Sequence, residues 1–250
     1  HPEKLMLRAF VLLIASITLV ATAHAREAVM LKAADGLKVT ADVYRAVVTP
    51  DATWIVLAHQ AGSSRGEYRT IAPRLNKLGF NAIAIDQRSG KAFGGVRNET
   101  AQRAAARGIK PNYASALPDI EAGIAFARQQ TKGRVVLWGS SYSAALALWM
   151  AGQAGARIDA VVSMSPGEYI RGRGIARAAA GIKVPVLITS PTSERRKWRN
   201  IFKAIPGERK VGFAPSSGGR HGSSALIPAR NKSSDAYWAV VEKFLAEHLS

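Results

Sequence analysis

The segment best suited to chemistry is residues 139–143, which reads Gly-Ser-Ser-Tyr-Ser. An apolar run, residues 135–138, precedes it, and a stretch rich in alanine and leucine follows it. This order predicts a strand that breaks into a sharp turn and then enters a helix. Such a turn holds its middle serine with the hydroxyl projecting above the sheet, so we predict that Ser141 is a nucleophile. The fifth position must be small because the strand and helix backbones nearly touch there, and Ser143 meets this need.

A serine hydroxyl needs a base to take its proton, and the base is usually a histidine oriented by a carboxylate. After residue 25 the chain has three histidines, His59, His221 and His248. His221 lies in the glycine-rich segment 218–224, between the last predicted strand and the last predicted helix. An exposed loop of this kind lets the side chain reach the serine, so we predict that His221 is the base. His248 is expected to be a surface residue of the last helix.

Two carboxylates are candidates for orienting the histidine. Glu194 follows the predicted strand 184–189, and Glu168 follows the strand before it. Each could instead be an ordinary surface charge, and Glu194 adjoins Arg195 and Arg196, with which it could pair. We prefer Glu194 as the acid and keep Glu168 as the alternative.

The elements that must position these residues alternate along the chain. Apolar runs and alternating patterns predict strands over 29–33, 38–45, 54–58, 81–85, 135–138, 158–164, 184–189 and 210–213. Helical spacing predicts helices over 68–78, 117–130, 144–151 and 238–249. Continuous apolar strands that alternate with helices are typical of an α/β fold with a mostly parallel sheet, and the first two strands are expected to form an antiparallel hairpin.

Four motifs occur in the order that is typical of one family: residues 59–64 after the third strand, a D-x-R turn at 86–88, the turn at Ser141, and the late His221. On these motifs the chain resembles the α/β-hydrolase superfamily, and within it the dienelactone-hydrolase-like or carboxylesterase group. Dienelactone hydrolases proper use a cysteine nucleophile, whereas this chain contains no cysteine and offers a serine.

The resemblance implies an α/β-hydrolase fold, with a mostly parallel central sheet and helices on both faces. It also implies ester hydrolysis through a Ser-His-acid triad and an acyl-enzyme, without a cofactor. The triad residues of this family occur in the order Ser, acid, His. The position of Glu194 is the commonest one for the acid, and the position of Glu168 is the one that some lipases use.

The segment 59–64 resembles the H-G-x-x-G loop that supplies one amide of the oxyanion hole. The resemblance implies that the backbone N–H of Gln60 or Ala61, together with that of Tyr142, faces the negative charge that develops on the substrate. One such donor is worth about 10²–10³ in rate. His59 is expected to hold the backbone of this loop rather than to react.

The first 25 residues are predicted to be a secretory leader. A short positive region, residues 6–8, precedes an apolar core over 9–21, and Ala23-His24-Ala25 has the A-x-A form of a cleavage site. A membrane anchor is the alternative, but the apolar run is short for a helix that needs about 20 residues to cross a bilayer. We therefore expect cleavage before Arg26, one α/β-hydrolase domain over 26–250, and a periplasmic or secreted location.

The net charge of the chain is +18, and +17 remains once Lys4, Arg8 and Glu3 are removed with the leader. Such a charge favours anionic partners, and the expected ones are a small-molecule ester and a non-specific anionic polymer. An alternative function is therefore a non-catalytic cationic protein that binds anionic envelope polymers on a hydrolase scaffold. No phosphate-binding glycine loop, H-E-x-x-H motif, acidic metal cluster or nucleic-acid motif occurs in the sequence, so we expect neither metal nor specific nucleic acid. Stable membrane insertion is not expected.

Overall fold

The computed structural model describes residues 26–249. The predicted leader, residues 1–25, lies outside the described residues, as does Ser250. Among the helices of the described part, none is both long enough and apolar enough to cross a membrane.

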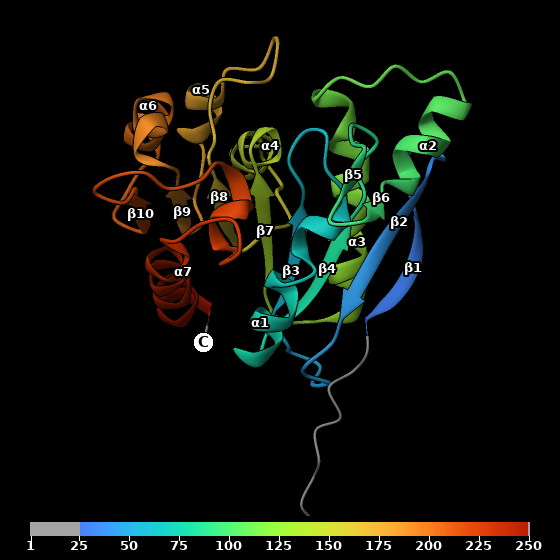
Figure 1. Ribbon diagram of the computed structural model, residues 1–250, viewed down its shortest axis with the longest axis horizontal. Helices are drawn as coiled ribbons and strands as arrows, with labels where there is room; N and C mark the ends of the chain where they lie inside the picture. Colours follow the sequence, from blue (N-terminus) through green and yellow to red (C-terminus); the bar gives the residue numbers. More distant parts are fainter. Residues whose placement is uncertain (1–25, 250) are drawn as a thin grey trace, which may run out of the picture.

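Strands and helices alternate along the described chain, as Figure 1 shows. The strands are β1 (Glu27–Lys32), β2 (Lys38–Tyr44), β3 (Trp54–Ala58), β4 (Asn81–Ile85), β5 (Ala92–Phe93), β6 (Val96–Arg97), β7 (Val135–Ser140), β8 (Ala160–Met164), β9 (Val186–Thr189) and β10 (Lys210–Phe213). The α-helices are α1 (Ile71–Lys77), α2 (Glu99–Ala106), α3 (Leu117–Gln130), α4 (Tyr142–Ala151), α5 (Ile175–Ala179), α6 (Arg195–Ala204) and α7 (Ser234–Leu249). Short 3₁₀ helices are η1 (Arg65–Tyr68), η2 (Ala114–Ala116), η3 (Thr192–Glu194) and η4 (Gly222–Leu226).

Eight strands form one sheet in the order β1-β2-β4-β3-β7-β8-β9-β10, and β5 and β6 pair separately. Strand β2 is antiparallel to both of its neighbours. The other six strands of this sheet run parallel to one another: β4, β3, β7, β8, β9 and β10. Strand β7 therefore lies inside the parallel part, between β3 and β8. The predicted fold class is confirmed, and so is the antiparallel hairpin at the start. The carboxyl ends of the parallel strands meet at one end of the sheet, the upper end in Figure 1, where α/β proteins bind their ligands.

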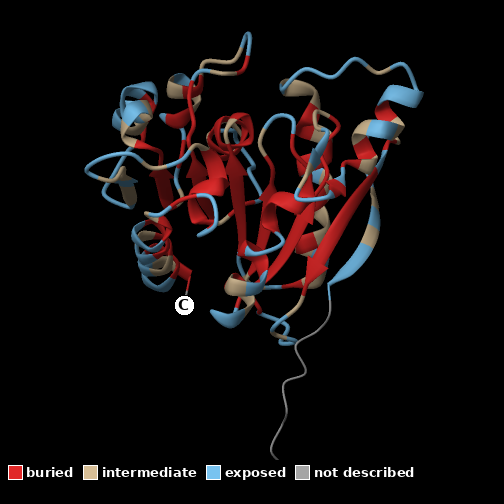
Figure 2. Ribbon diagram, in the orientation of Figure 1, coloured by how far each residue is buried: buried red, intermediate tan, exposed pale blue. Residues whose placement is uncertain are grey.

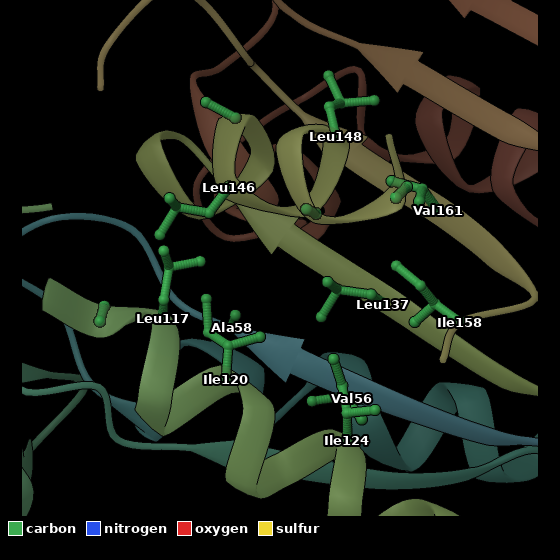
Figure 3. Packing of buried hydrophobic residues seen from close by; sticks show 14 of the residues in the cluster. Val56, Ala58, Leu117, Ile120, Ile124, Leu137, Leu146, Leu148, Ile158 and Val161 are labelled. Atoms are coloured by element: carbon green, nitrogen blue, oxygen red, sulfur yellow. The ribbon is translucent and has the colours of Figure 1, made fainter. Parts of the chain in front are cut away.

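Helices cover both faces of the sheet because alternate residues of the buried strands point to opposite sides. On one face, Val56 of β3 and Leu137 of β7 pack with α3, α4, α5 and α6. On the other face, Ile55 and Val136 pack with α1 and α7. Figure 2 shows the strands of the sheet centre buried, and Figure 3 shows Leu137 between the strand and helix side chains of the first face. Burial on both sides explains why these strands are continuous apolar runs.

The structure differs from the sequence prediction mainly in three helices that were not predicted: α2, α5 and α6. The segment 90–112 contains the β5–β6 hairpin and α2, whose first turn is capped by the Asn98 side chain accepting from the Ala101 N–H at 2.8 Å. Helix α6 is rich in Arg and Lys, but Trp198 and Ile201, three residues apart, are buried in the core. Its amphipathic period is hard to see in the sequence because Arg and Lys surround these two apolar residues.

Leu137→Ala should lower the free energy of unfolding by about 2–5 kcal/mol, because it removes a fully buried side chain from the central strand. Leu78→Ala deletes the same atoms from a side chain that is 39% exposed, and it should cost less than about 0.5 kcal/mol. Urea denaturation of both variants checks the difference. Equal effects would contradict the placement of Leu137 in the core.

Candidate active site

The backbone at Ser141 is strained in the way that a reactive serine turn requires. Ser141 has φ 60° and ψ −118°, a conformation that non-glycine residues rarely adopt. Its N–H donates to the Met164 carbonyl at 2.8 Å, and helix α4 begins at the next residue. The turn is tight, since a Cβ atom on Gly139 would lie 2.1 Å from the carbonyl oxygen of Ser143. Only glycine fits at that position.

Position 143, where the G-x-S-x-G pattern has glycine, carries a serine side chain in this chain. Ser143 is fully buried, and its hydroxyl donates to the carbonyl of His59 at 2.7 Å. The Gln87 side-chain amide donates to the same hydroxyl and to the carbonyl of His59. Ser143 is therefore small enough for the turn, and it also ties helix α4 to the loop that follows β3.

His221 and Glu194 are in direct contact. The Nδ1 atom of His221 lies 2.9 and 2.8 Å from the two carboxylate oxygens of Glu194. An ionised carboxylate only accepts hydrogen bonds, so Nδ1 carries the proton and Nε2 is left free to accept one. Partial burial alone would raise the pKa of Glu194, but the hydrogen bond and charge of His221, with help from Lys197, hold that pKa below its usual value.

The alternative acid, Glu168, and the remaining histidine, His248, have other roles in the structure. The Glu168 carboxylate accepts from the N–H groups of Ile175 and Ala176 at 2.7 and 2.9 Å, so it caps helix α5. His248 packs against Phe244 near the end of α7, with ring centroids 5.0 Å apart. Of the two candidate acids, Glu194 is the one that the structure brings to His221.

The loop that carries His221 is anchored at the carboxyl ends of two neighbouring strands, β7 and β8. The N–H of Gly222 donates to the Ser165 hydroxyl at 2.9 Å, and the N–H of Ser223 donates to the Ser140 hydroxyl at 2.8 Å. A Cβ atom on Gly222 would lie 2.5 Å from that Ser140 oxygen, so glycine permits this close approach. His221 is thus one residue from a contact with the end of β8 and two from a contact with the residue before Ser141.

The structure separates the two candidate amides of the oxyanion loop. The N–H of Gln60 donates at 3.0 Å to the buried carboxylate of Glu67. The prediction for Gln60 is therefore wrong, because an amide that points inward to a carboxylate cannot face the substrate. Ala61 is exposed and lines a cleft, and within residues 26–249 its N–H has no hydrogen-bond acceptor. His59 has the backbone-holding role that was expected: it is fully buried and accepts from the N–H of Gln87 at 3.0 Å.

The second predicted amide, that of Tyr142, is the first N–H of helix α4. The first N–H groups of a helix have no partner within the helix and carry its positive dipole end. The Tyr142 ring is held by an offset stack with Tyr113, with centroids 4.5 Å apart and planes 16° apart. As the first N–H of α4, the Tyr142 amide has no acceptor within the helix and lies beside Ser141.

A cleft of about 610 Å³ adjoins the oxyanion loop. Its walls are the loop at Ala61 and Gly62, the turn after β4, helix α2 and the segment that leads to Tyr113. Most of the side chains there are apolar or small, and Arg88 and Lys91 bring cationic groups to the lining. Much of this lining comes from the segment 90–112. Among the described residues, no group of three or more His, Asp or Glu side chains could hold a metal ion.

The comparison with protein families agrees with this geometry. Residues 49–205, more than half of the chain, match the family described as serine aminopeptidase, S33. The chain belongs to this α/β-hydrolase family. The matched residues of the hydrolase include the oxyanion loop, the Ser141 turn and Glu194, whereas His221 lies beyond them. Among curated protein sequences, none matches the chain.

Solved structures with the same fold include hydrolases of several kinds. An esterase of Pyrococcus furiosus superposes with a TM-score of 0.68 at 15% identity, over 90% of this chain and 93% of the other. A dienelactone hydrolase of Anabaena variabilis gives 0.64 at 17% identity, over 90% and 98%. The acylaminoacyl peptidase of Pyrococcus horikoshii gives 0.66 at 16% identity, over 90% of this chain but only 41% of that one. These likenesses establish the fold of the hydrolase.

Replacing the two candidate acids should separate their roles. Glu194→Gln should lower kcat by orders of magnitude, up to about 10⁴, because the neutral amide no longer favours the required histidine tautomer. Glu168→Gln should leave kcat nearly unchanged and lower the free energy of unfolding by about 1 kcal/mol, as the weakened cap of α5 predicts. Steady-state kinetics on a p-nitrophenyl ester and urea denaturation measure the two effects. The reverse ranking in kcat would make Glu168 the acid.

Proposed function

We propose that this hydrolase is a serine esterase that cleaves carboxylic esters through an acyl-enzyme. The observation that carries the proposal is the pair of Glu194 and His221, held by a loop that is bonded to the nucleophile strand. The strained turn at Ser141 supplies the third member of a Ser-His-acid triad. The esterase among the solved structures of the same fold also supports this class of substrate.

In the proposed mechanism, the Oγ atom of Ser141 attacks the ester carbonyl while Nε2 of His221 takes its proton. Glu194 holds Nδ1 and stabilises the imidazolium that forms. The carbonyl oxygen becomes an oxyanion, which the amides of Ala61 and Tyr142 bind. The imidazolium then gives its proton to the leaving alcohol, and an acyl-enzyme remains on Ser141.

Water completes the reaction by the same steps. His221 removes a proton from the water, the resulting hydroxide attacks the acyl carbonyl, and the proton passes to Ser141 as the acid leaves. The cleft beside Ala61 would hold part of the substrate, and the small and apolar side chains of its α2 wall suit an uncharged group. The family description and one of the similar structures refer to peptidases. The esterase proposal therefore states which bond is cleaved, an ester rather than a peptide bond, whereas the serine nucleophile is expected in either case.

We further propose that the hydrolase works outside the cytoplasm, in the periplasm or as a secreted protein. The leader predicted over residues 1–25 is the support for this location. N-terminal sequencing of the protein from a secretory host should find Arg26 first. An intact leader in a membrane pellet would contradict it.

Binding of an anionic polymer is a second function, and a charged edge of the molecule favours it. We define the cationic edge as the exposed Arg and Lys side chains of the loop before α5, of α5 and of α6, apart from Lys197, which pairs with Glu194. Its members are Arg171, Arg177, Arg195, Arg196, Arg199 and Lys203. None of these forms an ion pair within residues 26–249, and helices α5 and α6 lie next to each other in Figure 1. The cationic edge would hold a polyanion beside the active site without replacing hydrolysis.

Ser141→Ala should abolish hydrolysis of p-nitrophenyl acetate while leaving the fold intact, because it removes the attacking oxygen. Ser143→Ala is the matched control for hydroxyl loss within the turn; its hydroxyl holds the loop after β3, so it should reduce the rate without abolishing it. Steady-state kinetics with circular dichroism as the test of folding measure both. Full activity in Ser141→Ala would contradict the proposed nucleophile.

Salt should separate the two proposed functions. Turnover of a neutral ester should change little between about 20 and 150 mM NaCl, because an uncharged substrate is not steered by distant surface charges, whether or not salt screens them. Retention on immobilised alginate should fall over the same range as counterions compete.

Replacing Arg196, Arg199 and Lys203 together by Gln should weaken that retention and leave turnover unchanged. A control triple variant at the exposed Lys38, Lys77 and Lys132 removes the same charge elsewhere. Equal loss of retention in the two variants would contradict a localised site. A turnover that falls with salt in parallel with retention would show that the basic segments shape the active site.

A further inference from the structure

Glu67 is a buried carboxylate that the proposed triad does not use. It lies in η1, immediately after the oxyanion loop, and its exposed fraction is 0%. One oxygen accepts from the N–H of Gln60 at 3.0 Å, and the other accepts from the hydroxyl of Ser140 at 2.7 Å. Gln60 adjoins Ala61, and Ser140 adjoins Ser141. The carboxylate therefore joins the oxyanion loop to the nucleophile turn.

The link continues to the loop of the base. The hydroxyl of Ser140 also accepts from the N–H of Ser223 at 2.8 Å, and Ser223 is two residues after His221. The Ser223 hydroxyl in turn accepts from the indole N–H of Trp138 at 3.0 Å. One carboxylate and one hydroxyl thus connect the three segments that carry the proposed nucleophile, base and oxyanion amide.

The direction of these hydrogen bonds requires a carboxylate. The N–H of Ser223 occupies a lone pair of the Ser140 oxygen, so the single hydroxyl hydrogen of Ser140 points at Glu67. The N–H of Gln60 can only donate, so Glu67 must accept from both partners, one at each oxygen. A glutamine in this position offers only one accepting oxygen, and its NH₂ group would meet one of the two donors.

An ionised carboxylate buried in this way lowers the stability of the folded protein, so its presence calls for a functional reason. Within the described residues Glu67 forms no ion pair, and burying a charge without a cationic partner costs free energy. Burial raises the pKa of Glu67, while the hydrogen bonds from Gln60 and Ser140 and the charge on His221 act in the opposite direction. Buried ionisable groups without a charged partner are found preferentially at functional sites, and Glu67 is such a group.

We propose that Glu67 is a positioning residue of the active site: it fixes the oxyanion loop, the nucleophile turn and the His221 loop relative to one another, and its negative charge favours the imidazolium of His221. The proposal rests on the esterase mechanism above. Glu194 acts on His221 directly through Nδ1, whereas Glu67 acts through Ser140 and through its charge. The site therefore has two carboxylates with different roles.

The test uses Glu67→Gln, Ser140→Ala and the double variant of the full chain, with p-nitrophenyl acetate as substrate. Each single variant should lower kcat by about 10- to 100-fold with little change in KM, because small misplacement of reacting groups costs that much. The double variant should be little worse than either single one, since both break the same link. Additive losses would overturn the link between Glu67 and Ser140.

The pH profile of kcat/KM distinguishes a positioning role from a merely structural one. The groups around His221 that carry charge are Glu194, with Lys197 behind it, Arg220 beside it, and Glu67. Removing the negative charge of Glu67 makes the imidazolium less stable, so neutral His221 persists to lower pH. In the wild type, protonation of Glu67 at low pH would also weaken its hydrogen bond with Ser140 and lower kcat/KM. Glu67→Gln removes this contribution as well, which again moves the acid limb to lower pH. The acid limb should therefore move to lower pH in Glu67→Gln, while the maximal rate falls.

Asp159→Asn is the control for loss of a structural carboxylate that lies away from the proposed site, just before β8. Asp159 accepts from the Val135 N–H at 2.7 Å and from Arg128 at 2.6 Å, at the opposite end of β7 from Ser141. This variant should be less stable but keep the wild-type kcat and acid limb. The same kcat and acid limb in Glu67→Gln as in wild type would overturn the role of Glu67 while the esterase stands.

Two other outcomes are also informative. A wild type that hydrolyses no ester contradicts the proposed function itself, before any variant is compared. If Glu67→Gln does not fold, Ser140→Ala carries the test, because it breaks the same link and leaves the carboxylate in place. A wild-type kcat in a folded Ser140→Ala would then overturn the proposal.

Discussion

The backbones of β7 and α4 come into contact at Gly139 and Ser143, and the rest of the site depends on this contact. A Cβ on Gly139 would overlap the backbone of Ser143, so the turn between them is as tight as a polypeptide permits. The tight turn forces Ser141 into its strained conformation and leaves the Tyr142 amide at the start of a helix. The proposed nucleophile and the proposed oxyanion-binding amide thus arise from one steric constraint.

Buried polar groups then hold the surrounding loops against this turn. Ser143 binds the loop after β3, Ser140 binds the loop of His221, and Glu67 binds both the oxyanion loop and Ser140. Each of these hydrogen bonds contributes only about 1 kcal/mol to stability, but leaving a buried partner unpaired costs more. The loops are therefore ordered before substrate binds, which electrostatic stabilisation of an oxyanion requires.

Much of the fold could be predicted because buried strands and sharp turns have local sequence signals, namely apolar runs and glycines. The turn at Ser141 and the late His221 both have glycines nearby and follow apolar strands. Gln60 was predicted wrongly because the direction of its backbone N–H depends on a partner that the motif does not show, the buried carboxylate of Glu67. Glu67 itself has no local signal: its role comes from Ser140, which is 73 residues away in the sequence. Helix α6 was missed because only Trp198 and Ile201 mark its buried face among many charges.

The central claim is that Ser141 is the nucleophile, activated by His221 within a preorganised site. The most direct measurement is the reaction of the folded protein with a fluorophosphonate, followed by mass spectrometry of the intact chain and of its peptides. The account predicts one adduct per chain, located on Ser141, and no labelling in the His221→Ala variant or after denaturation. An adduct on another serine, or a folded wild-type protein that is not labelled at all, would contradict it.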